Sequence, residues 1–320
     1  MTPSAPVRRL FVGIPTYNRP DMVRETIESL RQSDLTDFVA IVSDNASSPE
    51  AADSVADFVK SLCDDRFSFV RQPANGGEYG QGRYFFAEAE TAGAEYFMIL
   101  HDDDLLDPDY LTGALNALDA APDAALYIVN PRLIDEAGTI SAEMTETYLR
   151  DHGRMAGQVG YFPILEPLLD TGFTPISGTV FRRSALVQSG FVDEDCFGNF
   201  PFELNVLLRL GDLGLRGWFE PETKLSVRYH RDSLRNTLGL MQNPAVVGTM
   251  LTLLERRAYT GFAEKRRRII LSRLYRARAE IAIGQGERAR AQKDARLACR
   301  ARPQSISAWK TRFLMSLRRS

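Results

Sequence analysis

Three consecutive aspartates, Asp102, Asp103 and Asp104, follow an apolar run of strand length at residues 96–100. Adjacent carboxylates repel one another and resist burial, so a hard divalent cation with oxygen ligands explains their grouping best. Ligand crevices of open α/β sheets lie outside the carboxyl ends of the strands, where these side chains would project. The alternative is a solvated turn that caps a helix starting near Pro108.

Strand-like apolar runs alternate with helical patterns over roughly the first 120 residues. Each run stops at a polar loop, and apolar residues at helical spacing follow. Unalternating apolar runs are typical of strands buried on both faces of a parallel sheet. The pattern predicts a wound α/β domain with a mostly parallel sheet. The runs lie at residues 10–14, 38–42, 66–70 and 96–100.

The composition is that of an ordinary globular protein, with 320 residues of which 44% are hydrophobic and 25% charged. Its three cysteines are far apart in the sequence, so neither a disulfide framework nor a zinc knuckle is indicated. No secretory signal precedes the first apolar run, and no stretch approaches the length of a membrane span. We therefore expect a cytoplasmic protein.

The charge is distributed unevenly along the chain. Residues 231–320 carry 21 Lys+Arg and 6 Asp+Glu, which leaves 18 of the chain's 39 basic and 36 of its 42 acidic residues for positions 1–230. An acidic body with a basic tail suggests a surface for anionic partners, with membrane lipid and nucleic acid as candidates. The alternative is that the arginines cover a helical bundle.

Four of the polar loops carry short sequence motifs. The motifs are Ile-Pro-Thr-Tyr-Asn-Arg at 14–19, Val-Ser-Asp-Asn-Ala-Ser at 42–47, Asn-Gly-Gly at 75–77 and His-Asp-Asp-Asp at 101–104. Together, in this order and each at a strand end, they resemble the motifs of family 2 glycosyltransferases with the GT-A fold. The resemblance covers about residues 8–230.

The resemblance implies a fold class and a domain plan. The fold is α/β, the GT-A nucleotide-diphospho-sugar transferase fold, with a wound, mostly parallel sheet between helices and a C-terminal helical appendage. The expected domains are a glycosyltransferase domain at 1–235, with a nucleotide-sugar-binding part at 1–120 and an acceptor and catalytic part at 121–235, and a basic helical region at 236–320.

The resemblance also implies a nucleotide site built from the first loops. Asp44 would accept a hydrogen bond from the imide N–H of a pyrimidine base. Its alternative role is an Asx turn that ties its own loop. Glycine at position 76 lets the backbone approach the nucleotide because it lacks a Cβ. The residues implied to bind the nucleotide are Pro15, Thr16, Tyr17, Arg19, Asp44, Asn75, Gly76, Asp102 and Asp103.

By the same resemblance, Asp102 and Asp104 hold Mn²⁺ or Mg²⁺, which bridges the two phosphates and stabilises the departing diphosphate. His230 would complete the metal shell, and a purely structural histidine is the alternative. Arg228 and Arg231 are candidate phosphate contacts.

Family members carry an acidic pair before a helix of the pattern Asp-Leu-x-Leu-Arg-Leu, and the second acid is the catalytic base. Aligning the helix on Arg209 places Glu203 at that second acid, where it would take a proton as Asp does. Phe202 replaces the first acid and Asn205 replaces the helix Asp. An acid favoured by the helix dipole is the alternative reading of Glu203. Other candidates for the base are Asp193, Glu194 and Asp195.

Two further stretches are less regular. Residues 131–175 are poorly periodic and are interpreted either as acceptor-facing loops or as a variable surface excursion. The last helix, with Trp309 and Phe313 beside Lys310 and Arg312, forms a basic amphipathic end. Such a segment can lie in a membrane interface, and packing in a homodimer is the alternative.

The resemblance thus implies an inverting, metal-dependent glycosyltransferase. It would move a sugar from a nucleotide-sugar, UDP-sugar first and dTDP-sugar second, to a hydroxyl of a saccharide, lipid-linked or small-molecule acceptor. We expect no nucleic-acid partner, and a cytoplasmic location that includes peripheral contact with the inner face of the membrane. The alternatives are a nucleotide-sugar-binding protein without catalysis, favoured by Phe202, and a sugar nucleotidyltransferase, whose glycine-rich phosphate loop is not found after the first strand.

Overall fold

The computed structural model describes residues 8–154, 159–196, 198–229 and 237–317. The chain forms two compact units, each described below by itself. The first comprises Met1–Val192 and Val206–His230, and the second comprises Asp193–Asn205 and Arg231–Ser320. The predicted domain boundary at residue 235 falls outside the described residues and stays a prediction.

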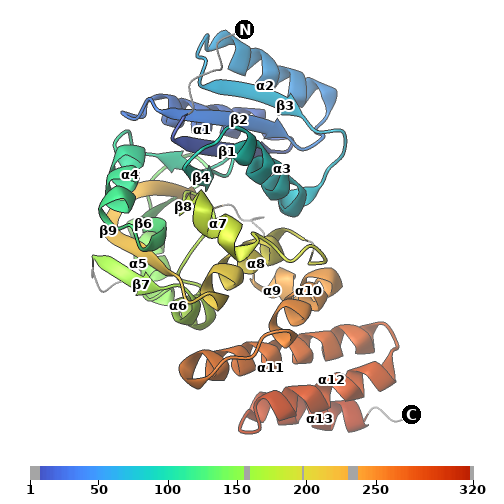
Figure 1. Ribbon diagram of the computed structural model, residues 1–320. Coiled ribbons are helices and arrows are strands. Elements are labelled where there is room, and N and C mark those ends of the chain that lie inside the picture. The colour runs from blue at the N-terminus through green and yellow to red at the C-terminus, as the bar shows by residue number, and fades with distance from the viewer. Residues whose placement is uncertain (1–7, 155–158, 197, 230–236, 318–320) are drawn as a thin grey trace. The chain divides into compact units, whose positions relative to one another are not determined.

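A nine-stranded sheet runs through the described part of the first unit, in the order β3-β2-β1-β4-β8-β6-β9-β5, with β7 paired to β9 (Figure 1). From β3 to β4 the pairs are parallel, β8 is antiparallel to both of its neighbours, and β6 and β9 are parallel again. The predicted parallel pairing is therefore found among β3, β2, β1 and β4, which form the first half of the sheet. The second half mixes parallel and antiparallel pairs. The strands are β1 (Leu10–Thr16), β2 (Phe38–Asp44), β3 (Phe67–Arg71), β4 (Tyr96–Ile99), β5 (Leu105–Leu106), β6 (Ala124–Ile134), β7 (Gly160–Pro163), β8 (Val180–Arg182) and β9 (Arg216–Arg228).

Helices connect most of these strands, as the alternation in the sequence predicts. Proline in the first turn starts both α1 and α2, where its missing N–H has no intrahelical role. Ser48 caps α2 by accepting the N–H of Ala51 at 3.3 Å. The helices are α1 (Pro20–Arg31), α2 (Pro49–Ser61), α3 (Gly77–Thr91), α4 (Tyr110–Ala120), α5 (Ala142–Asp151), α6 (Leu165–Thr171) and α7 (Arg183–Ser189).

Both faces of β1 are buried, which explains why its sequence does not alternate. Leu10, Val12 and Ile14 lie in one core cluster with residues of α1, α2 and α4. Gly13, on the other face, meets α3 so closely that an added Cβ would lie 2.4 Å from the ring of Phe85. Helices therefore pack against both faces of β1, and this packing fixes the position of its carboxyl end.

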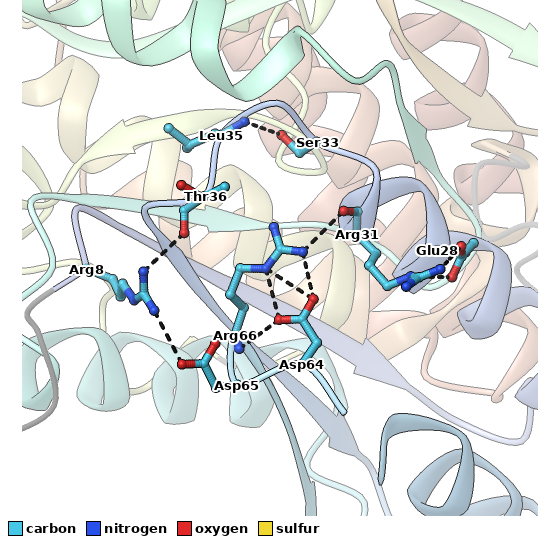
Figure 2. Close-up of polar contacts among 9 residues, drawn as sticks. All are labelled: Arg8, Glu28, Arg31, Ser33, Leu35, Thr36, Asp64, Asp65 and Arg66. Carbon is cyan, nitrogen blue, oxygen red and sulfur yellow. Dashed lines mark hydrogen bonds and ion pairs between the residues drawn. The ribbon is translucent and has the colours of Figure 1, made fainter. Parts of the chain in front are cut away.

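At the amino-terminal end of the parallel strands, ion pairs and hydrogen bonds link the segments just before β1, β2 and β3 to the end of α1 (Figure 2). Arg66 pairs with Asp64 at 2.7 Å and donates to the carbonyl oxygen of Arg31, the last residue of α1, at 3.2 Å. Arg8 reaches the carbonyl oxygen of Thr36 at 3.3 Å. These contacts brace the end of the sheet opposite to the loops that follow the strands.

The stretch 131–175, interpreted from the sequence as loops or a surface excursion, contains the second half of β6 together with α5, β7 and α6. These elements are too short for periodicity to reveal them, since β7 has four residues and α6 has seven. Arg154 anchors the stretch, because its buried guanidinium donates to the carbonyl oxygens of Val129, at 3.1 Å, and Phe173.

The second unit is helical, as predicted for the C-terminal region. It holds the start of α8 (Asn199–Asp212), then α9 (Thr237–Gln242), α10 (Pro244–Glu255), α11 (Gly261–Gly284), α12 (Arg288–Ala301) and α13 (Ile306–Leu317).

Small side chains let α11, α12 and α13 pack closely. Ala279, Ala282, Ala291 and Ala295 form a buried cluster with Met315, which α13 contributes. Among the described residues, no helix is both long and apolar enough to cross a membrane.

Candidate functional site

The loops that follow β1, β2 and β4 meet at one edge of the sheet. Thr16 and Asp44, the last residues of β1 and β2, are register partners, so their loops begin side by side. Leu100, just after β4, donates its N–H to the carbonyl oxygen of Gly13 on β1 at 3.0 Å. Because parallel strands end at the same edge, the three polar loops predicted from the sequence lie together.

Asp102 faces β1 and is largely buried. The hydroxyl of Thr16 donates to its carboxylate at 2.9 Å, and the guanidinium of Arg19 lies 3.4 Å away. Arg19 also pairs with Asp103 at 3.1 Å. Burial raises the pKa of the Asp102 carboxyl to about 6, and the charge of Asp103 adds to the rise, whereas Arg19 and Thr16 oppose it.

Asp104 is held from the other side and is only 1% exposed. The hydroxyl of Ser177 donates to one of its oxygens at 2.6 Å, and the backbone N–H of Arg228 donates to the other at 3.1 Å. The turn itself is closed by the N–H of Asp104, which donates to the carbonyl oxygen of His101 at 3.2 Å. These contacts fix the orientation of the Asp104 carboxylate.

His101, Asp103 and Asp104 each offer a ligand atom, and the three atoms lie within 4.8 Å of one another. Two carboxylates and an imidazole form a donor set that suits a divalent cation such as Mn²⁺. The predicted metal pair was Asp102 and Asp104. Asp104 belongs to this group, whereas the carboxylate of Asp102 contacts Thr16 and Arg19, and the metal role of the pair stays a prediction. His101 was not predicted, although its place directly before the aspartates is the signal that could have identified it.

His230, the predicted third ligand, and Arg231 lie outside the described residues. Arg228 was predicted to contact phosphate, but its side chain is buried and donates to groups of the protein instead. Its guanidinium donates to the carbonyl oxygens of Asp103 at 3.2 Å and Glu136 at 3.1 Å. The predicted phosphate role is therefore replaced by a structural one.

Asp44 makes the turn contact considered for it, whereas its role toward a nucleotide base stays a prediction. One oxygen accepts the N–H of Ser47 at 3.1 Å, which is the predicted turn contact, and lies 3.8 Å from the side chain of Arg71. The other oxygen, Oδ1, is buried and finds no hydrogen-bond donor within the described ranges of the chain. A buried carboxylate oxygen without a donor is costly, so this position is suited to accept an N–H from a ligand.

Asn45 joins the second loop to the third. Its amide donates to the side-chain oxygen of Asn75 at 3.0 Å and accepts the N–H of Gly76 at 2.9 Å. The predicted residues Asn75 and Gly76 are thereby brought beside the loop that carries Asp44. Asn18 and Ala46, in the first two loops, have left-handed φ angles of 54° and 63°. Such backbone strain in non-glycine residues is common at ligand sites.

Of the remaining predicted nucleotide contacts, Pro15 is partly buried and Tyr17 is 48% exposed. Both belong to the β1 end and the loop after it, together with Thr16 and Arg19. The nine residues implied to bind the nucleotide therefore all lie at the strand ends or in the loops that follow them, at this edge of the first unit. Their individual contacts with a nucleotide stay predictions.

Glu203, the predicted base, is partly buried near the start of α8 and belongs to the second unit. Two of the alternative bases are held by arginines of the same unit: Asp193 pairs with Arg257 at 3.1 Å, and Asp195 pairs with Arg256. Glu194 is exposed. The role of Glu203 stays a prediction.

The two departures from the expected helix pattern have structural explanations. Asn205 accepts the N–H of Asp193 at 3.0 Å and donates to its carbonyl oxygen at 3.2 Å, so it closes the preceding loop. Phe202 is 2% exposed and serves as a core residue where the pattern has an acid.

Comparison with known proteins adds a family match. The model of a family described as "Glycosyl transferase family 2" matches residues 11–186. The GalNAc(5)-diNAcBac-PP-undecaprenol beta-1,3-glucosyltransferase of Campylobacter jejuni is 28% identical over 193 residues, which are 60% of this chain and 57% of that protein. The galactofuranosyltransferase GlfT2 of Mycolicibacterium smegmatis is 33% identical over 112 residues, 32% of this chain and 17% of that protein. The chain thus spans little more than half of the first relative and a small part of the second.

Solved structures show the same fold at low identity. Residues 1–349 of TarS from S. aureus, in complex with UDP-GlcNAc, superpose with a TM-score of 0.62 at 13% identity, covering 97% of this chain and 92% of that one. The mannosyltransferase PcManGT from Pyrobaculum calidifontis, in complex with GDP-Man and Mn²⁺, has a TM-score of 0.56 at 15% identity, with 98% and 81% covered. These neighbours confirm the predicted fold class, including the helical C-terminal region.

Proposed function

The chain belongs to glycosyl transferase family 2 and is a glycosyltransferase, and from that premise we propose that it is an inverting, metal-dependent enzyme that uses a nucleotide-sugar donor. The observation that supports a nucleotide-sugar donor is the buried Oδ1 of Asp44. This oxygen accepts no hydrogen bond from the described residues. It lies at the same edge of the sheet as the turn formed by Asp102, Asp103 and Asp104, which we call the aspartate turn. The family match leaves the nucleotidyltransferase and the non-catalytic binding protein without support.

The proposed donor carries a base with an imide N–H, which would donate to Asp44. Uracil and thymine both present such a group, and we propose UDP-sugar first and dTDP-sugar second. The solved TarS structure contains UDP-GlcNAc, whereas that of PcManGT contains GDP-Man, so the fold alone accommodates different bases. Asn75 and Gly76 would bring the third loop against the nucleotide, with no side chain from the glycine in the way.

The proposed cation, Mn²⁺ or Mg²⁺, would be held by the aspartate turn, and when bound it supplies positive charge that stabilises the departing diphosphate. The candidate metal ligands that lie close together are His101, Asp103 and Asp104, and His230 remains the proposed further ligand. Asp102 would orient Thr16 and Arg19 toward the nucleotide, since both already contact its carboxylate. Ser177 keeps the Asp104 carboxylate in place while the ligand binds.

The proposed reaction is a single displacement at the anomeric carbon. The Glu203 carboxylate takes the proton of the acceptor hydroxyl while that oxygen forms a bond to the anomeric carbon. The bond from the anomeric carbon to the diphosphate oxygen breaks, and its electron pair leaves with the nucleoside diphosphate. Attack from the face opposite to the leaving group inverts the configuration at that carbon.

The proposed acceptor is a hydroxyl of a saccharide or of a lipid-linked saccharide, with a small-molecule acceptor as the alternative. The name of the C. jejuni relative specifies an undecaprenol-linked acceptor, and the chain is 28% identical to it over 60% of its own length. A lipid-linked acceptor would bring the enzyme to the inner face of the membrane as a peripheral protein. A homodimer through the C-terminal helices is the alternative use of that region.

Calorimetry with UDP, dTDP and GDP in the presence of Mn²⁺ tests the donor proposal. We expect tight, metal-dependent binding of UDP or dTDP, which the Asp102→Ala, Asp104→Ala double variant loses. Asp53→Ala is the matched control, because Asp53 is an exposed carboxylate on α2 in the same unit. Absence of binding to every nucleotide with metal would refute the donor site.

A further inference from the structure

The last helix, α13, has one packed side and one apolar exposed side. Ala308, Thr311 and Met315, spaced three and four residues apart, are buried against the other helices of the second unit. Arg276 of α11 donates to the hydroxyl of Thr311 at 3.3 Å, which fixes this side inward. The opposite side of α13 must therefore face away from the bundle.

That opposite side carries large apolar residues. Ile306 is 85% exposed, Trp309 48% and Phe313 61%, and their spacing of three and four residues places them in one row along the helix. Leu314, 45% exposed, lies beside the row. We call these four residues the α13 apolar row. A row of this size on an exposed helix marks an interaction surface, whereas isolated apolar residues on a surface do not.

The charged residues of α13 itself are all basic. Lys310 lies within the row and Arg312 at its side, where the guanidinium stands 4.9 Å from the ring centre of Trp309. Beyond Asp294 the sequence has seven Lys+Arg and no Asp or Glu. Long basic side chains can extend past an apolar surface to place their charges at a polar boundary.

We propose that the α13 apolar row lies in the interface of a membrane that contains anionic lipids. Ile306 and Phe313 would enter the acyl boundary, Trp309 would lie at the level of the headgroups, and Lys310 and Arg312 would contact lipid phosphates. The indole N–H of Trp309 donates to the carbonyl oxygen of Pro303 at 2.6 Å, so the ring would carry no unsatisfied polar group into the interface.

Charge decides between a membrane and a second copy of the chain. Two α13 helices packed through this row would bring Lys310 and Arg312 of one copy against those of the other, with no acidic residue on either helix to compensate. Anionic lipid complements both the apolar row and its basic surround. The inference rests on the proposed function, because a lipid-linked acceptor gives the enzyme a reason to reach the membrane.

Sedimentation with vesicles tests the inference on the full chain. The wild type should sediment with vesicles of phosphatidylcholine and phosphatidylglycerol, and much less with phosphatidylcholine alone. The triple variant Ile306→Ser, Trp309→Ser, Phe313→Ser should lose binding by about tenfold or more. Lys310→Gln with Arg312→Gln keeps the row and should weaken binding on the order of tenfold, mainly at low salt. Val187→Ser, which removes an exposed apolar side chain of α7, should bind as the wild type does.

The possible outcomes separate this inference from the donor site. Equal vesicle binding by the triple variant, or no preference for anionic vesicles, would overturn it. A dimer in size-exclusion chromatography that the triple variant converts to a monomer, without vesicle binding, would also overturn it in favour of a second copy. The vesicle assay needs neither nucleotide nor acceptor. Vesicle binding without nucleotide binding would therefore refute only the donor site, and nucleotide binding without vesicle binding would refute only the membrane inference. A melting curve close to that of the wild type shows that the variant bundle is folded.

Discussion

Arg228 donates its backbone N–H to the carboxylate of Asp104 at 3.1 Å, and it holds the same turn a second time through its side chain, which donates to the carbonyl oxygen of Asp103 at 3.2 Å. The guanidinium also binds the carbonyl oxygens of Asp135 and Glu136, and it reaches the carboxylate of Glu25 on α1. One buried arginine at the end of β9 therefore connects the aspartate turn to two other parts of the first unit.

Replacing Arg228 with Met should loosen the aspartate turn. The carbonyl oxygens would lose their donor in a buried place, which costs about 1–3 kcal/mol of the free energy of unfolding. We expect the Kd for Mn²⁺ in the presence of nucleotide to rise at least about tenfold, because the carboxylates proposed to bind the metal are no longer held in a fixed orientation. Calorimetric metal titration and urea unfolding measure the two effects.

Glu25→Gln is the matched control for this prediction. The Glu25 side chain is 55% exposed, so its pair with Arg228 is screened by water and contributes little. We expect this variant to bind metal nearly as the wild type does. Unchanged metal affinity in Arg228→Met would contradict the positioning role of the arginine.

Asp44→Asn should weaken binding of the nucleotide base. Asn keeps the shape, and its oxygen can still accept the N–H of Ser47, so its NH₂ group would then face the imide N–H of the base. Two opposed donors cost about 1–3 kcal/mol, or roughly tenfold to a hundredfold in Kd.

A nucleotide methylated at the imide nitrogen completes a double-mutant cycle for Asp44. The wild type should lose affinity for the methylated nucleotide, whereas Asp44→Asn should discriminate little between the two ligands. Additive effects of the two changes would show that the imide N–H does not contact Asp44. Asp53→Asn, on the exposed side of α2, serves as the control.

Glu203→Gln should abolish proton removal without disturbing the donor site. General base catalysis typically contributes about 10²- to 10⁴-fold, so kcat should fall by a factor in that range. The Kd for the nucleotide diphosphate should stay within about twofold, because Glu203 is proposed to contact only the acceptor. Transfer assays and calorimetry on the same preparation measure both quantities, and Glu194→Gln is the control. An active Glu203→Gln enzyme would return Glu194 to consideration, since arginines hold Asp193 and Asp195.

The sequence predicted those parts of the site that depend on local order along the chain. Buried strands that end in polar loops place Thr16, Asp44 and the aspartates at one edge, because parallel strands end together. The partners of Asp104 could not be predicted in this way. Ser177 and Arg228 are 73 and 124 residues away, and their positions depend on how β8 and β9 enter the mixed half of the sheet. The buried Arg228 was for that reason interpreted as a phosphate contact.

Labelling of thiols should distinguish the three cysteines in the native protein. Cys63 is exposed, whereas Cys196 and Cys299 are buried. Burial raises the pKa of the Cys196 thiol to about 11, so almost no thiolate is present at neutral pH. We expect one fast-reacting thiol with iodoacetamide at neutral pH, which Cys63→Ser removes, and three after unfolding. Mass spectrometry of the labelled chain checks this count, and fast labelling of Cys196 would show that its surroundings open readily.

The Arg66–Asp64 pair at the amino-terminal end of the strands should make stability depend on acid pH (Figure 2). The side-chain hydrogen bonds from Arg66 hold the pKa of the Asp64 carboxyl below its ordinary value, against the opposing effect of burial. A lowered pKa in the folded state stabilises the protein above the unfolded value of about 3.9. This contribution is lost as the pH falls through the folded value.

Asp64→Asn measures that contribution. Both side chains are mostly sheltered, at 13% and 18% exposure, so we expect the variant to be about 1 kcal/mol less stable at neutral pH. The difference from the wild type should shrink as the pH falls below about 3.9, where the unfolded carboxylate takes up a proton, and it should be lost below the lowered pKa of the folded carboxylate. Glu28→Gln is the control, since the Arg31–Glu28 pair is more exposed, at 43% and 38%, and should change stability by less than about 0.5 kcal/mol. Urea unfolding at several pH values measures both variants, and a difference that stays constant down to the lowest pH would exclude the ion pair as its source.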